Sequence, residues 1–137
     1  MKKYEGKKQI LATPMSRLEY NEYRGWQLPE NENGSDEGFL VEYIDGGEAN
    51  HPDHAGYISW SPKVVFENAY NPIDTYAQRI QLEYAELSQK ITKLQVFLES
   101  DDFPKLEYEN QRLLQKQYTH MNEYLIILYT RMRRSLV

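Results

Sequence analysis

The residues best suited to chemistry are arginines and tyrosines in the second half of the chain. This arginine-tyrosine cluster comprises Arg79, Arg131, Arg133, Arg134, Tyr76, Tyr124 and Tyr129. Guanidinium groups offer paired donors to phosphate, and tyrosine rings stack on purines while their hydroxyls form hydrogen bonds. Cations near a helix C-terminus also complement its dipole, and tyrosines also serve packing. The cluster therefore predicts either a phosphate-containing ligand or a purely structural role.

A second cationic set could face solvent or a neighbouring subunit. Its members are Lys90, Lys93, Arg112, Lys116 and His120. The one candidate metal site in the sequence is His51-Pro52-Asp53-His54, which contains three potential ligands. A polar loop without a metal explains these residues equally well. The chain has no cysteine and no familiar catalytic motif. We predict no catalytic residue, no metal site, no cofactor and no enzymatic activity.

Two apolar heptad patterns must position the cluster. The first consists of Ile73, Ala77, Ile80, Tyr84, Leu87, Ile91, Leu94 and Leu98. The second consists of Leu114, Tyr118, Met121, Leu125, Leu128 and Met132. Such spacing keeps one face of each helix toward a partner and predicts an αα-hairpin. We expect helices from about Pro72 to Glu99 and from about Pro104 to Arg134, the first capped by Asn71.

Residues 1–71 predict a small antiparallel β module with short helices. Strands are expected at 10–12, 38–44 and 56–60. Ser16-Arg17-Leu18-Glu19 has the form of a capping box, for a helix that Gly25 would end. A further helix should open at Ser61-Pro62 and run through Tyr70. The fold class is thus α+β, with a module over residues 1–71 and a hairpin over residues 72–137.

Charge limits the possible partners. Residues 1–72 carry 7 Lys/Arg against 12 Asp/Glu, and residues 73–137 carry 9 against 9. That balance argues against a long nucleic acid as ligand. No apolar run is long enough to span a membrane, so we expect no membrane association and a cytoplasmic protein. Since a two-helix hairpin cannot bury both apolar seams alone, it should pack on the first module, on another copy, or on both.

Two stretches resemble known phage families. The run from Gly38 to Tyr43, followed by Asp45-Gly46-Gly47 and by Gly56 to Lys63, resembles a family of small tailed-phage and prophage proteins. That resemblance covers about residues 10–71, and it implies no function.

The hairpin is similar to the one shared by anti-CBASS and anti-Thoeris phage sponges. The matching positions are Arg79, Glu83, Leu87, Ile91, Leu94, Leu113, Leu114, Gln117, Met121, Tyr124, Leu128 and Arg131. The resemblance implies a homo-oligomer in the host cytoplasm that sequesters cyclic oligonucleotides or cyclic ADP-ribose isomers without degrading them. For such a sponge we predict Arg79, Arg112, Tyr124 and Arg131 as the ligand-binding residues. Alternatives are a hairpin that docks on a host or phage protein, and an oligonucleotide-binding accessory protein.

Overall fold

The computed structural model describes residues 1–135, which divide into two compact units. The first unit spans Met1–Tyr70 and the second begins at Asn71. Together they give an α+β fold, as the sequence predicted. Within the described residues, no helix is both long and apolar enough to cross a membrane.

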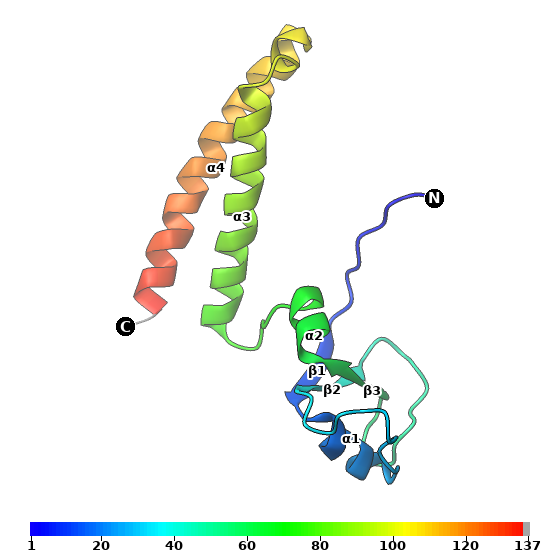
Figure 1. Ribbon diagram of the computed structural model, residues 1–137. Coiled ribbons are helices and arrows are strands. Elements are labelled where there is room, and N and C mark those ends of the chain that lie inside the picture. The colour runs from blue at the N-terminus through cyan, green and yellow to red at the C-terminus, as the bar shows by residue number, and fades with distance from the viewer. Residues whose placement is uncertain (136–137) are drawn as a thin grey trace. The chain divides into compact units, whose positions relative to one another are not determined.

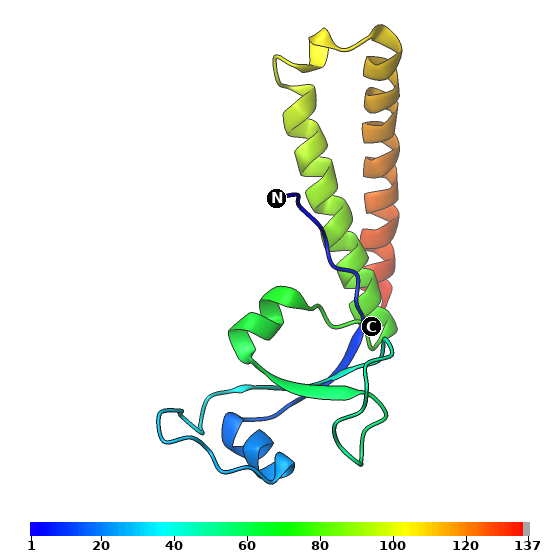
Figure 2. The same ribbon diagram turned by 90° about the vertical axis from the view of Figure 1, so that its right-hand side faces the viewer.

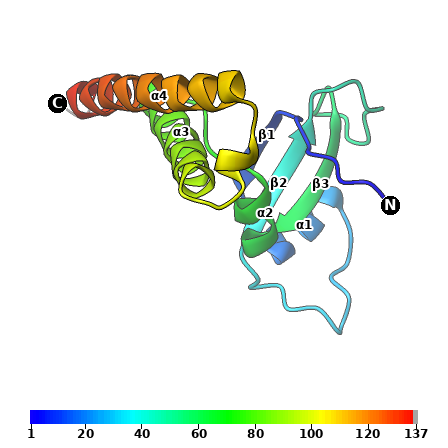
Figure 3. The same ribbon diagram turned by 90° about the horizontal axis from the view of Figure 1, so that it is seen from above.

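The first unit is built on a three-stranded antiparallel sheet. Its strands β1 (Ile10–Pro14), β2 (Gly38–Tyr43) and β3 (Tyr57–Pro62) lie in the order β1-β2-β3, so the predicted antiparallel β module is a three-stranded meander (Figure 3). The central strand β2 is the most buried of the three. The outer strands β1 and β3 form the two edges of the sheet.

Two short helices cover opposite faces of this sheet (Figure 2). Helix α1 (Arg17–Arg24) packs Tyr20 against Leu40 and Ile58. Its predicted capping box and its C-terminal Gly25, at φ 72°, are both present. Helix α2 (Lys63–Ala69) covers the other face, where Phe66 stacks on Phe39 of β2 at 4.0 Å between ring centroids. Apolar residues on alternate sides of the strands therefore give each helix a surface to bury.

Polar side chains complete the first unit where the backbone would otherwise be unpaired. Asn50 accepts from the Ile58 N–H at 2.7 Å and donates to the Ile58 C=O at 2.9 Å. It thus takes the place of a neighbouring strand at the β3 edge. Trp60 donates its indole N–H to the Met15 C=O at 2.7 Å. Gly56 is required because a Cβ there would collide with the backbone of β2.

The second unit is the expected antiparallel hairpin, formed by α3 (Tyr76–Leu98) and α4 (Tyr108–Ser135) lying side by side (Figure 1). The predicted helix starts were wrong. Helix α3 begins after Thr75, which forms a capping box with Gln78, and not at Pro72. Pro104 lies in the 3-10 turn η1 (Phe103–Lys105), so α4 begins four residues later than expected.

The heptad pattern correctly identified the inner faces of both helices. Ile80, Ile91 and Leu128 are buried, with Leu128 fully enclosed. The other seam residues from Ala77 onward are at least half-buried, whereas Ile73 precedes α3 and is exposed. Over residues 71–135 these three are the only buried side chains of the hairpin, so much of its apolar surface remains in contact with water.

Candidate ligand-binding site

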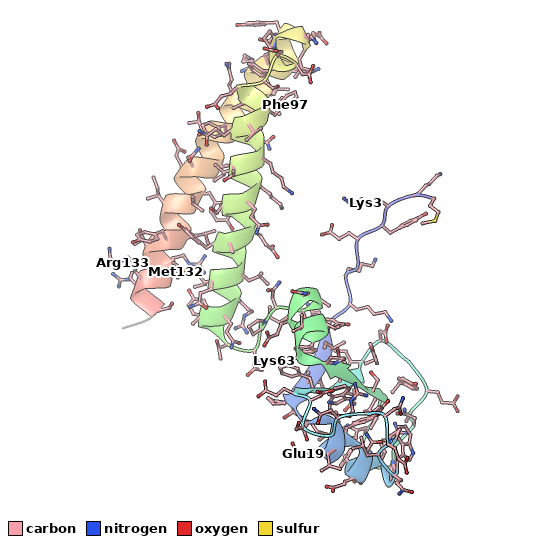
Figure 4. The ribbon with its side chains drawn as sticks, viewed as in Figure 1. Lys3, Glu19, Lys63, Phe97, Met132 and Arg133 are labelled. Atoms are coloured by element: carbon pink, nitrogen blue, oxygen red, sulfur yellow. The ribbon has the colours of Figure 1, made fainter. Side chains whose placement is uncertain are left out.

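The arginine-tyrosine cluster gathers where α3 begins and α4 ends, which we call the open end of the hairpin. Arg131 donates an Nη2–H to the Tyr76 hydroxyl at 3.1 Å, and its guanidinium carbon lies 5.8 Å from the centre of that ring. This hydrogen bond is the main reason that the pKa of Arg131 is raised. Figure 4 shows Met132 and Arg133 at this end, far along the hairpin from Phe97. Residues 55 positions apart in the chain thus form one cationic, aromatic surface.

Tyr124 lies on the same stretch of α4, and its hydroxyl donates to the carboxylate of Glu83 on α3. Glu83 also contributes, as the smallest of the favourable causes, to the raised pKa of Arg131. A carboxylate therefore occupies the position next to Tyr124 and Arg131 that an anionic ligand would take. Any phosphate that binds there must compete with Glu83 for these donors.

Arg79 reaches the same end but is partly used by the backbone. Its Nη1 donates to the Ile73 C=O at 3.0 Å and to the Asp74 C=O at 2.9 Å. These bonds fix the segment that leads into α3. Since a guanidinium carries five N–H groups, three remain to meet an anion.

Arg112 is not brought to the open end. It forms a two-point ion pair with Glu109, at 2.7 and 3.2 Å, in the first turns of α4. This contact lowers the pKa of Glu109 and raises that of Arg112. Nineteen helical residues separate Arg112 from Arg131, which is about 28 Å along the axis. The four predicted ligand-binding residues therefore cannot line one pocket within a single chain.

A shallow hollow of about 320 Å³ lies at the open end, lined by Tyr129, Thr130, Arg133 and Arg134. The guanidinium of Arg133 lies 5.8 Å from the centre of the Tyr129 ring. Tyr129 also contacts Tyr84 of α3, at 6.1 Å between ring centroids. Two arginine-tyrosine pairs thus lie on α4 and the start of α3, each with one aromatic ring beside a cation.

The histidine loop serves the structure of the first unit. His54 Nδ1 lies 2.5 Å from the Glu42 carboxylate and its Nε2 lies 2.7 Å from the Tyr23 hydroxyl. His51 stacks on Tyr23 at 4.4 Å. Over residues 1–135, no group of three or more His, Cys, Asp or Glu side chains is placed to hold a metal ion. The ring contacts join the loop to α1 and β2.

Sequence reasoning missed a groove of about 810 Å³ between α1 and β3. The Arg17 guanidinium lies 4.4 Å from the Trp60 ring and the Arg24 guanidinium lies 4.3 Å from the Trp26 ring. Arg17 also pairs with Glu32 at 3.2 Å. Arg24 and Trp26, two positions apart, were a sequence signal, but the pairing of Arg17 with Trp60 depends on the meander.

Comparison with known protein families gives a match to the second half of the chain. Residues 74–134, which correspond closely to the hairpin, match the model of a family described as Sequestin. Neither the curated proteins nor the solved structures contain a significant match to this chain. The family match supports a protein of the sequestering type, whose relevant part is the helical hairpin.

Proposed function

We propose that this protein is a phage anti-defence sponge. It binds cyclic nucleotide immune signals, either cyclic oligonucleotides or cyclic ADP-ribose isomers, and sequesters them without degrading them. The observation that carries this proposal is the Sequestin match over residues 74–134, since the same residues hold the arginine-tyrosine cluster.

The chemistry of the open end fits an anionic ligand with planar rings. Arg131 uses one of its five N–H groups on Tyr76, which leaves donors for a phosphate. Tyr76 and Tyr129 are both about half exposed and can receive a base on their rings. Sequestration requires only binding groups and exclusion of water, so it needs neither a metal nor a general base.

A second copy would supply what one chain lacks. The hollow of about 320 Å³ at the open end is near the lower limit of the volumes of ligand sites, and it is open to the surface rather than enclosing. Ile126 and Ile127, which are 66% and 57% exposed, give α4 an apolar outer surface suited to burial against another hairpin. If two hairpins pack antiparallel, Arg112 of one copy approaches the open end of the other. We therefore retain Arg112 as a binding residue contributed by the partner.

The test is calorimetric titration of the purified protein with cyclic dinucleotides, cyclic trinucleotides and cyclic ADP-ribose isomers. Replacing Arg131 by Ala should weaken binding of the active class by about tenfold or more, because a hydrogen bond to a charged group is worth about 1.5–3 kcal/mol. Lys2→Ala, in the exposed N-terminal residues outside the family match, controls for the loss of one positive charge and should leave affinity unchanged. Arg112→Ala weakens binding only if a second copy completes the site.

Recovery of the ligand distinguishes sequestration from turnover. After incubation and heat release, mass spectrometry should return the added compound intact. A panel without binding, or an Arg131→Ala variant with full affinity, would contradict the proposed site. Recovery of a cleaved product would contradict sequestration itself.

The exposed apolar surface of α4 favours one alternative function, in which the hairpin docks on a host or phage protein. That alternative predicts no affinity for any nucleotide in the panel. It also predicts that Ile126→Asp abolishes capture of one defined protein while Arg131→Ala does not.

A further inference from the structure

We infer that the first unit pairs with a second copy of itself through the free edge of β1, and that each copy's lysine-rich N-terminal arm lies in an acidic cleft of the other. The arm is residues 1–9, which precede β1 and contain no helix or strand. This inference goes beyond the proposed function and does not depend on it, because it concerns the unit outside the family match.

The two edges of the sheet differ in whether a side chain bonds their outward-pointing backbone groups. At the β3 edge, Asn50 covers both backbone groups of Ile58. At the β1 edge, the direction of the backbone groups follows from Met15, the residue directly after β1. Its N–H points toward β2 and donates to the Gly38 C=O. Backbone groups alternate in direction along a strand, so Ile10 and Ala12 must point away from β2. No side chain between residues 1 and 135 covers these groups as Asn50 covers Ile58.

An open edge of this kind is a template for another strand. Residues 11–14 of β1 are exposed, and Leu11 retains 58% of its accessible surface. Pro14, at the end of the strand, offers a carbonyl but no N–H. A second β1 placed antiparallel, with Ala12 opposite the partner's Ala12, would gain four backbone hydrogen bonds. Two link the alanines, and one in each direction links an Ile10 N–H to a Pro14 carbonyl.

The arm continues the line of β1 at its first residue. Lys8 forms an ion pair with Asp45 at 2.9 Å and lies over the Tyr43 ring at 5.4 Å, which holds the base of the arm beside β2. Beyond it, Lys2, Lys3 and Lys7 carry positive charge and Glu5 one negative charge. All residues of the arm are exposed. The arm therefore extends β1 as a positively charged segment. Within residues 1–135, Asp45 is the acidic side chain that pairs with it, through Lys8.

An acidic cleft of about 500 Å³ lies at the opposite end of β1. Its lining includes Pro14, Glu19, Glu37, Lys63 and Glu67. Only Glu37 has a lysine partner, since Lys63 bonds it at 3.2 Å. Three carboxylates thus face one ammonium group. Figure 4 shows Glu19 and Lys63 in this part of the unit and Lys3 out on the arm.

The direction in which the arm leaves β1 determines whether the arm of the same chain or the arm of the partner can reach the cleft. The arm leaves β1 at Ile10, whereas the cleft begins at Pro14, about 14 Å further along the strand. To reach its own cleft the arm would have to reverse direction beside β1. In the antiparallel pair, the partner's arm continues past Pro14 without a turn. The partner's Lys7 then arrives at the cleft, where charge complementarity favours it.

Cysteine cross-linking tests the strand pairing, because the natural chain has no cysteine. In the proposed register the Cα atoms of Ala12 and the partner's Ala12 are about 5.5 Å apart, which a disulfide can bridge. Thr13 and the partner's Thr13 would be about 8 Å apart, which it cannot. The full-length Ala12→Cys protein should form a disulfide-linked dimer under mild oxidation, while the Thr13→Cys control should not. Equal cross-linking of both variants, or of neither, overturns the pairing.

A charge exchange tests the arm. In the Ala12→Cys background, Lys7→Glu and Glu67→Lys each place like charges together in their own homodimers. When the two proteins are mixed, both arm-cleft contacts of the heterodimer join opposite charges. The cross-linked heterodimer should exceed each homodimer by roughly tenfold, compared with twofold for random pairing. Random proportions would show that the arm does not occupy the cleft. Tryptophan fluorescence should match the parent in every variant, since the exchanged residues are exposed.

Discussion

Replacing Asn50 by Ala is the sharpest test of how the first unit is stabilised. The substitution removes the 2.7 and 2.9 Å bonds and leaves the N–H and C=O of Ile58 without a partner. Ile58 is only 1% exposed, and an unpaired buried polar group costs about 1–3 kcal/mol. Since Asn50 itself is half-buried, water should reach one of the two groups, and we expect a loss of about 2 kcal/mol.

The assay can observe the first unit alone because both tryptophans of the chain, Trp26 and Trp60, lie in it. For a domain of 60–100 residues, ~1 kcal/mol moves the melting temperature by about 4–8 °C. The fluorescence-detected transition of Asn50→Ala should therefore fall by about 8–16 °C. Asn33→Ala is the control, since the Asn33 side chain accepts hydrogen bonds from Ser35 in an exposed loop, and it should change stability by less than about 0.5 kcal/mol. Equal melting temperatures for the two variants would refute the role given to Asn50.

Three further outcomes follow from buried or charged residues. The hydrogen bond from His54 lowers the pKa of Glu42 below 4.5, so stability linked to Glu42 is complete above that pH and lost as pH falls through the folded-state pKa. Glu42→Gln should flatten the fluorescence-detected stability between pH 5.5 and 3, and an unchanged slope would contradict this linkage. Leu128→Ala should destabilise the hairpin by about 3 kcal/mol and Val96→Ala, at an exposed position of α3, by less than ~0.5 kcal/mol, measured by circular dichroism of the helices. Gly56→Ala should prevent the first unit from folding, because its Cβ would meet the β2 backbone; a native fluorescence spectrum would disprove that clash.

Local signals in the sequence predicted most of the fold. The capping box at Ser16 and Glu19, the turn at Gly25 and the β-rich runs each depend on neighbouring residues, and each was correct. The start of α3 was misplaced because Asn71-Pro72 also has the form of a helix start. Thr75 and Gln78 cap the helix reciprocally, and that arrangement prevails. Two competing caps within five residues cannot be ranked by pattern alone.

The candidate site was predictable only in part. Heptads identify the face of a helix that meets its partner, and in the structure Tyr124 and Arg131 of α4 form hydrogen bonds with Glu83 and Tyr76 of α3. Heptads do not show how far Arg112 lies, along the helix axis, from a pocket that several chains would form together. The pairing of Arg17 with Trp60 was not visible either, since it depends on the strand register.

The covered edge at Asn50 determines what kind of assembly the sheet can join. A sheet with two open edges can recruit chains on both sides, and its growth has no natural end. Here Asn50 covers both backbone groups of Ile58 at the β3 edge, so in the proposed arrangement pairing through β1 ends after two copies. A variant that uncovers β3 would convert a closed pair into a unit able to extend in both directions. We therefore expect Asn50 to oppose such extension as well as to support the fold.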